Sequence, residues 1–114
     1  MQRNKVLSYL GLATKAGRVV SGEFCVEKSV RQHRAKLVLV SEDASKTSKK
    51  NFRNMCTYYK VPLHFFGSRE ELGAACGKEA RVSAAIVDEG LADAVLRELG
   101  PETRTGMGGS EYVE

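Results

Sequence analysis

The chain has 114 residues, 42% of them apolar, and a formal net charge of +4. This length and apolar content suit one domain with one hydrophobic core, so we expect neither a disordered chain nor a membrane span, which needs an apolar run of about 18–20 residues. Residues 1–60 hold 13 Lys or Arg against 4 Asp or Glu, whereas residues 61–100 hold 4 against 7. This asymmetry indicates either a polyanionic partner, of which nucleic acid is the commonest, or an unevenly charged soluble surface.

Helical and strand patterns alternate along the chain. Apolar residues recur every three or four positions in the helical segments, and they run without a break in strands that should be buried on both faces. In order we predict a helix over 6–16, a strand at 19–20, a helix over 23–33, a strand over 35–41, a helix over 46–60, a strand over 61–66, a short helix between 68 and 77, a strand over 82–87 and a helix over 91–99.

Strands separated by helices require crossover connections. We therefore expect an α/β fold: a three-layer α/β/α sandwich with a four-stranded mixed sheet. It should occupy residues 1–100, and the glycine-rich segment over 101–114 should be a flexible tail.

The predicted helix over 46–60 contains five cations and no acid. Surface helices usually interleave both charges, because opposite charges four residues apart stabilise a helix by a few tenths of a kcal/mol. A phosphate backbone would turn the self-repulsion of this helix into attraction, and a solvated basic face is the alternative interpretation. We place the cations opposite the buried apolar face, and they are Lys46, Lys49, Lys50, Arg53 and Lys60.

The predicted helix over 23–33 begins directly after Ser21-Gly22. A glycine at a helix start lets another molecule approach the free backbone N–H groups, which suit phosphate or base oxygens. Phe24, Lys28 and Arg31 recur at i, i+4 and i+7, so one stripe carries an aromatic ring and two cations. This combination is typical of RNA binding, in which unpaired bases stack beside phosphates. The alternative is that Phe24 packs into the core.

Two acidic pairs offer the strongest enzymatic alternative. Glu42-Asp43 and Asp88-Glu89 follow the second and fourth predicted strands. Carboxylates clustered at strand ends can hold Mg²⁺. Helix capping is the simpler interpretation, because Asp43 or Ser45, and Asp88, stand where helices begin. Without a nucleophile elbow or phosphate loop we expect no catalytic residue, no metal site and no cofactor.

The cysteines and histidines do not point to a reactive site. Cys25, Cys56 and Cys76 form no Cys-x-x-Cys pair, so we expect reduced, partly buried thiols in a cytoplasmic protein rather than a zinc or redox site. His33 and His64 have no evident catalytic partner, and His64, inside a predicted strand, is expected to be structural.

Several sequence strings are informative in combination. Gly22 opens a helix and is followed by Ala35-Lys-Leu-Val-Leu-Val-Ser-Glu-Asp-Ala44, Leu72-Gly-Ala-Ala-Cys-Gly77 and Ala85-Ile-Val-Asp-Glu-Gly90. Together they resemble the superfamily of archaeal and eukaryotic ribosomal proteins called L-seven-Ae and L-thirty-e. Two further strings resemble its bacterial YlxQ-type branch: Leu10-Gly-Leu-Ala-Thr-Lys-Ala-Gly17 and Val20-Ser-Gly-Glu23. The resemblance covers residues 3–99.

The resemblance implies a protein that binds kink-turn RNA, a sharply bent helix–internal loop–helix with tandem sheared G·A pairs. Members of the superfamily grip the bend with the start of the second helix and the loop before the last strand, which here is 78–83. Many members direct an Asn-Glu pair at the G·A bases, where this chain has Phe24-Cys25. We therefore expect a modest kink-turn preference. The residues expected to contact RNA are Gly22, Glu23, Phe24, Cys25, Lys28, Arg31, Lys49, Lys50, Arg53, Lys78, Arg81 and Ser83.

The sequence thus predicts a monomeric, cytoplasmic protein that binds structured RNA and associates with the ribosome, with no membrane or small-molecule partner. The alternative is a protein-interaction adaptor on the same fold, whose RNA site is degraded at Phe24-Cys25. An exposed Phe24 among apolar neighbours would favour the adaptor. An exposed Phe24 flanked by Lys28 and Arg31 would favour RNA.

Overall fold

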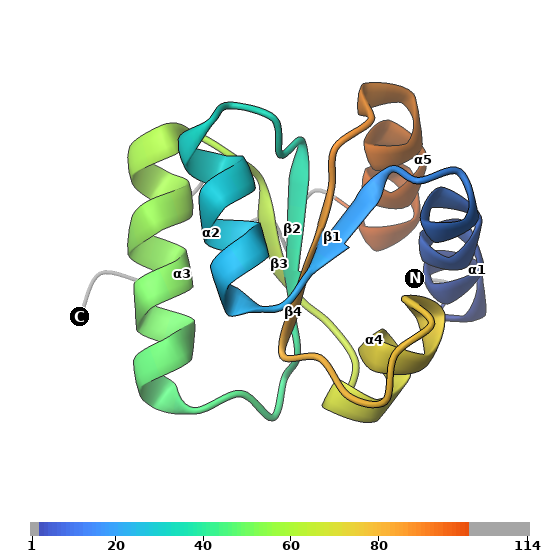
Figure 1. Ribbon diagram of the computed structural model, residues 1–114, viewed down its shortest axis with the longest axis horizontal. Helices are drawn as coiled ribbons and strands as arrows, with labels where there is room; N and C mark the ends of the chain where they lie inside the picture. Colours follow the sequence, from blue (N-terminus) through green and yellow to red (C-terminus); the bar gives the residue numbers. More distant parts are fainter. Residues whose placement is uncertain (1–2, 101–114) are drawn as a thin grey trace.

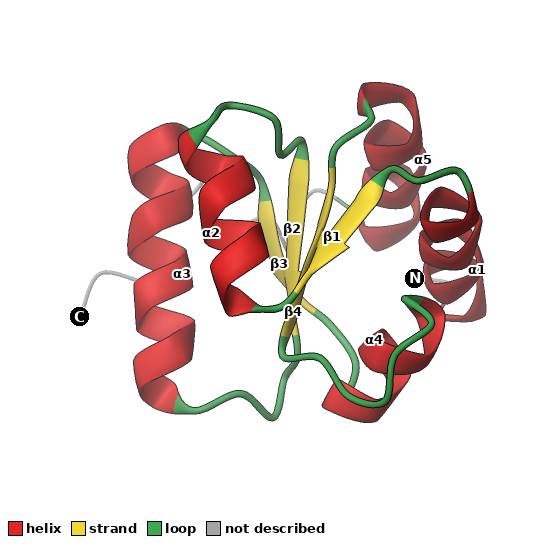
Figure 2. Ribbon diagram, in the orientation of Figure 1, coloured by secondary structure: helices red, strands yellow, loops and turns green. Residues whose placement is uncertain are grey.

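The computed structural model describes residues 3–100, so the predicted tail over 101–114 lies outside the described residues. Helices and strands alternate as the sequence predicts, and two layers of helices enclose one sheet (Figures 1 and 2). The elements are α1 (Arg3–Lys15), β1 (Val19–Ser21), α2 (Glu23–Arg31), β2 (Leu37–Val40), α3 (Lys46–Tyr59), β3 (Leu63–Phe65), α4 (Arg69–Ala75), β4 (Ser83–Ile86) and α5 (Glu89–Leu99).

The sheet is mixed, in the order β1-β4-β2-β3. β2 and β3 pair in parallel, whereas β4 runs antiparallel to both of its neighbours. In this register Val38 lies beside Leu63 on one side and Ala85 on the other. All four residues of β2 are buried because this strand is central and covered on both faces, as its unbroken apolar run predicts.

The two faces of the sheet carry separate apolar cores. One core joins α2 and α3 to the sheet, through residues such as Val30, Phe52 and Val38. The other joins α1, α4 and α5 to the opposite face, where Leu10 and Leu39 are fully buried. Figure 2 shows these helical layers on either side of the strands. The three-layer α/β/α sandwich is therefore confirmed.

Helix ends differ slightly from the predicted bounds. α2 ends at Arg31, two residues before the predicted end, because His33 has a positive φ of 61° that no helix continues through. α3 ends as predicted, with Lys60 in the left-handed conformation at its C-terminus. No helix within residues 3–100 is long and apolar enough to cross a membrane.

Candidate nucleic-acid interface

The start of α2 is an uncapped helix N-terminus. Gly22 has φ 92° and ψ 148° and supplies no side-chain hydrogen bond to the first turn. Its N–H donates to the Ser83 carbonyl at 3.1 Å, and its own carbonyl accepts from the Val26 N–H at 2.9 Å. A Cβ at Gly22 would meet nothing within 4 Å, so the positive φ, not space, demands glycine here. The first N–H groups of α2 are therefore left to an external acceptor.

The loop over 78–82 lies beside this helix start and is held by α4. A Cβ on Gly73 would be only 2.6 Å from the Ala80 Cα, so the loop backbone packs directly on the α4 backbone. The Lys78 N–H donates to the Gly73 carbonyl at 2.7 Å, and the Arg81 N–H donates to the Arg69 carbonyl at 3.0 Å. These contacts give the loop a fixed position.

Arg81 connects the loop to the chain just before α2. Its Nε donates to the Ser21 Oγ at 3.2 Å, and its Nη1 donates to the Ala80 carbonyl at 2.9 Å. Together with the Gly22–Ser83 hydrogen bond, this contact makes one continuous surface from two segments that lie some 60 residues apart in the chain. We call the surface formed by residues 22–25, Lys28 and 78–82 the α2 rim.

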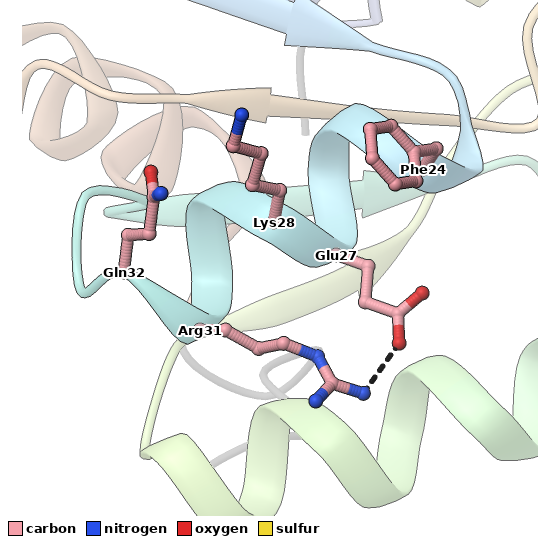
Figure 3. A pocket seen from close by; sticks show the side chains of 5 residues that line it. All are labelled: Phe24, Glu27, Lys28, Arg31 and Gln32. Carbon is pink, nitrogen blue, oxygen red and sulfur yellow. Dashed lines mark hydrogen bonds and ion pairs between the residues drawn. The ribbon is translucent and has the colours of Figure 1, made fainter.

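Phe24 is 76% exposed, so the interpretation that packed it into the core is wrong. A hollow of about 390 Å³ is lined by its ring and by Glu27, Lys28, Arg31 and Gln32. Figure 3 shows Phe24 and Lys28 on successive turns of α2, while Glu27 and Arg31 project toward the neighbouring helix. The neighbours of the exposed ring are polar or charged.

Arg31 already has a partner within its own helix. Its guanidinium forms an ion pair with Glu27 at 2.6 Å, and this carboxylate raises the pKa of Arg31. Both side chains also line the hollow between α2 and α3, together with Asn51 and Met55. The charge of Arg31 is therefore largely compensated, and Lys28 is the cation of α2 that remains beside Phe24.

Ser83 does not present its side chain at the surface. It lies in β4 beside Val40, on the face of the sheet that α2 and α3 cover, and its side chain is completely buried. Its contribution to the α2 rim is the backbone carbonyl that accepts from Gly22. The exposed part of the predicted loop therefore ends at Val82.

The cations of α3 form a second basic surface rather than an extension of the α2 rim. The prediction that Lys49 and Arg53 lie opposite the buried face is wrong, because each stands three residues before a buried residue, Phe52 and Cys56, and so flanks that face. Both cations are half-buried and stand over the Phe65 ring of β3, with Lys49 Nζ 5.7 Å and Arg53 Cζ 5.6 Å from its centroid. Lys50 is exposed. α2 packs beside the other side of α3, the one that carries Asn51 and Met55. The body of α3 therefore separates its cations, which lie toward the edge strand β3, from the α2 rim.

The two acidic pairs do not meet. Because the neighbouring strands β2 and β4 are antiparallel, their carboxyl ends point in opposite directions, and Asp43 and Asp88 follow them at opposite ends of the strands. Ser45 caps α3, Asp88 caps α5, and Asp43 accepts from the Arg69 N–H at the start of α4. Within residues 3–100 no group of three or more His, Cys, Asp or Glu side chains is placed to hold a metal ion. The strand-end magnesium site is therefore not formed.

The thiols differ in exposure. Cys56 and Cys76 are buried, and burial raises the pKa of both, that of Cys56 to about 12. Cys25 is exposed in the first turn of α2. His64 is fully buried in β3, as expected for a structural residue.

Two residues that support the α2 rim escaped the sequence prediction. Ser21 and Gly73 position Arg81 and the loop through contacts within the protein. Gly73 left a usable trace in the sequence, because a glycine inside a helix costs about 1 kcal/mol relative to alanine and often marks close packing. Ser21 left none, since its partner is 60 residues away.

Known proteins are similar to this chain in sequence and in fold. A model of the "Ribosomal protein L7Ae/L30e/S12e/Gadd45 family" matches residues 4–96. RNA-binding protein YlxQ of Bacillus subtilis is 51% identical over 87 residues, which cover 76% of this chain and 87% of the relative. Large ribosomal subunit protein eL30 of Yarrowia lipolytica is 35% identical, covering 84% of this chain and 90% of that protein.

A solved structure agrees with these relatives. The 15.5 kD RNA binding protein of Giardia lamblia superposes with a TM-score of 0.70 at 25% identity, over 78% of this chain and 77% of that one. Its agreement with the sandwich described above extends the relationship from sequence to fold. The chain therefore belongs to the ribosomal protein L7Ae/L30e/S12e/Gadd45 family, as a YlxQ-type member.

Proposed function

We propose that this protein binds structured RNA through the α2 rim. The observation that carries the proposal is the joining of the uncapped α2 N-terminus to the loop over 78–82, by the Gly22–Ser83 and Arg81–Ser21 hydrogen bonds. Family membership supports it, as do relatives and a structural neighbour whose names say that they bind RNA.

Each part of the rim suits a different part of RNA. The free N–H groups of the first turn of α2 suit phosphate or base oxygens. Phe24 offers an open ring on which an unpaired base can stack, an interaction worth about 1–3 kcal/mol. Lys28 and Lys78 are exposed cations that attract phosphates. Because the backbone of the rim is already fixed, little ordering cost opposes binding.

A rigid rim recognises shape, which favours bent RNA. RNA-binding proteins read mainly shape and unpaired bases, so a fixed surface stabilises the kinked state of an RNA by selecting it. We infer a modest preference for kink-turns, because Phe24-Cys25 replaces the polar pair that meets the G·A bases in many relatives. The protein acts as a monomer on ribosomal or ribosome-associated RNA in the cytoplasm.

The surroundings of Phe24 favour RNA over the adaptor alternative. A protein-docking site built on this ring would need apolar neighbours. The other side chains that line the hollow beside it form an apolar surface with their aliphatic stems but end in charged or amide groups, and they are Glu27, Lys28, Arg31 and Gln32.

Binding to two matched RNAs tests the proposal. One is a duplex with a kink-turn, and the other is the same duplex with its G·A pairs restored to Watson–Crick pairs. We expect tighter binding to the kink-turn, by about tenfold or less. The preference is limited because Phe24-Cys25 cannot make the polar base contact, and one bidentate base contact is worth about 1–3 kcal/mol. Phe24→Asn with Cys25→Glu should sharpen this preference.

Variants connect the binding to the rim. Phe24→Ala and Arg81→Gln should each weaken kink-turn binding. Tyr58→Ala is the matched control, because Tyr58 is 78% exposed but lies in the last turn of α3, away from the rim. If Phe24→Ala and Arg81→Gln bind like the wild type, the α2 rim is not the RNA surface. Equal affinity for both RNAs, unchanged in Phe24→Asn with Cys25→Glu, would remove the kink-turn preference.

A further inference from the structure

We propose that α3 and β3 form a second RNA-binding surface, which contacts the phosphate backbone of a duplex arm other than the segment held by the α2 rim. We call it the α3–β3 face, and its residues are Lys46, Lys49, Lys50, Arg53 and Phe65. The proposal rests on the proposed function, and it adds that the protein grips two segments of the same RNA.

The charges of α3 oppose the dipole of their own helix. A helix N-terminus carries partial positive charge, so acids there stabilise the helix and cations destabilise it. The first turn of α3 has no acid and begins with Lys46, and the last turn has no cation, so the favourable charge at this helix is confined to Lys60 at its C-cap. α2 has the stabilising arrangement, with Glu23 in its first turn and Lys28 in its last. The α3 pattern costs stability, and a polyanion bound at this face offsets that cost.

Phe65 holds two of the cations in place. Lys49 Nζ and Arg53 Cζ lie 5.7 Å and 5.6 Å from the centroid of this one ring, on the edge strand β3. Cation–π contacts of this kind restrain long side chains, which lowers the entropic cost of placing them on phosphates. The same contacts occupy the ring, so it is not open for base stacking as Phe24 is. The face therefore suits the backbone of a duplex rather than unpaired bases.

The body of α3 separates this face from the α2 rim. Between α2 and α3 lies a hollow lined by Glu23, Glu27 and Arg31 from α2, and by Asn51 and Met55, among others, from α3. Of its two carboxylates Glu27 is paired with Arg31 and Glu23 belongs to the α2 rim, so the hollow offers a phosphate backbone no unpaired cation between the two surfaces. A bent RNA presents two arms in different directions, and each basic surface can take one arm.

A triple variant tests the second surface. Lys49→Gln, Lys50→Gln and Arg53→Gln together remove three charges from the α3–β3 face. Lys5→Gln, Lys15→Gln and Arg97→Gln remove the same charge from α1 and α5, on the opposite layer of the sandwich. The wild type and both triple variants are titrated with a kink-turn RNA that has two long arms, and with the same RNA after one arm is shortened to a few base pairs. Each arm is shortened in turn.

We expect the α3–β3 variant to lose about tenfold in affinity for the long-arm RNA at physiological salt. Its plot of log affinity against log salt should be shallower by about 2–3, because each phosphate that a cation neutralises adds roughly 0.9 to the slope. The control variant should change little. Shortening the arm that contacts this face should remove most of the difference between wild type and the α3–β3 variant.

Three outcomes decide the proposal. If the α3–β3 variant loses no more affinity than the control, or if its loss persists whichever arm is shortened, the second surface is wrong. If the wild type binds neither RNA, the proposed function itself fails, which is a distinguishable result. Lys46→Gln with Lys50→Gln, which leaves both cations on Phe65 intact, should show a smaller loss in the same direction and guards against misfolding of the triple variant.

Discussion

Replacing Gly22 by alanine tests whether the backbone conformation at the start of α2 supports both the stability of the protein and its RNA binding. Gly22 has φ 92° and ψ 148°, a conformation that only glycine adopts readily, and a Cβ there would meet nothing within 4 Å. The whole cost of Gly22→Ala is therefore backbone strain, about 1–3 kcal/mol. For a domain of this size, 1 kcal/mol lowers Tm by roughly 4–8 °C, so thermal unfolding followed by circular dichroism should show a drop of about 5–20 °C.

The strain should also reach the RNA site. Relief of the strain turns the first N–H groups of α2 and lengthens the Gly22–Ser83 hydrogen bond, which is 3.1 Å in the native protein. Hydrogen bonds to charged groups are worth about 1.5–3 kcal/mol, so losing one should weaken RNA affinity by about tenfold or more. The affinity is measured well below Tm, where the variant remains folded.

Gly17→Ala is the matched control for Gly22→Ala. Gly17 also has a positive φ, 73°, and open space around its Cβ, but it follows α1. It should lower Tm without weakening RNA binding. A D-alanine at position 22, introduced by chemical ligation, accepts the positive φ more readily than L-alanine and should recover part of both Tm and affinity. The reasoning is refuted if Gly22→Ala leaves Tm unchanged, or if Gly17→Ala weakens RNA binding equally.

Three further predictions concern other parts of the molecule. In Gly73→Ala the new Cβ would overlap the backbone of the loop over 78–82, so the loop should shift. The free energy of unfolding in urea titrations should fall by about 1–3 kcal/mol, and RNA binding should weaken. Unchanged binding would contradict the role given to the loop. The Ser41 hydroxyl, followed by the Arg69 amide, lowers the pKa of Asp43 in the folded protein. The Asp43 carboxylate therefore stabilises the fold above its unfolded pKa of about 3.9, and this stabilisation is lost as the pH falls through the folded pKa. Asp43→Asn should flatten the acid limb of a Tm–pH profile, and an unaltered limb would oppose this. Maleimide should label exposed Cys25 quickly, and it should label buried Cys56, whose pKa is raised to about 12, only after unfolding, as mass spectrometry can check. Bound RNA should protect Cys25, and full labelling in the complex would argue against contact there.

Local features of the chain predicted most of the elements. The start of α4 is one example: Ser68 and Glu71 form a capping box with both of its hydrogen bonds, a motif that depends only on residues three positions apart. The bounds of α3 follow from helical spacing to within one residue, since the helix was predicted over 46–60 and ends at Tyr59. The unbroken apolar run of β2 indicated a strand buried on both faces. Glycine at position 22 and the aromatic and basic stripe after it also indicated where the α2 rim begins.

Periodicity alone could not place the charged residues against their neighbours. The interpretation of the sequence placed Lys49 and Arg53 opposite the buried face of α3, but each stands three residues before a buried residue, Phe52 and Cys56, and therefore flanks that face. Only the fold shows that both cations stand over the Phe65 ring of β3. The ring comes from another strand, so no spacing within α3 reports it. Phe24 had two interpretations in the sequence, and only the packing of α2 on the sheet showed that its ring is exposed.

Strand pairing made the remaining decisions. The sequence predicted a mixed sheet, but the order β1-β4-β2-β3 and the antiparallel direction of β4 depend on which strands form hydrogen bonds with each other. That pairing sends Asp43 and Asp88 to opposite ends of the strands, places the buried Ser83 side chain on a covered face of the sheet, and brings Arg81 to Ser21. These contacts join residues far apart in the chain. Periodicity and capping describe only the helix or strand in which they occur, so the rim's geometry was set by tertiary structure.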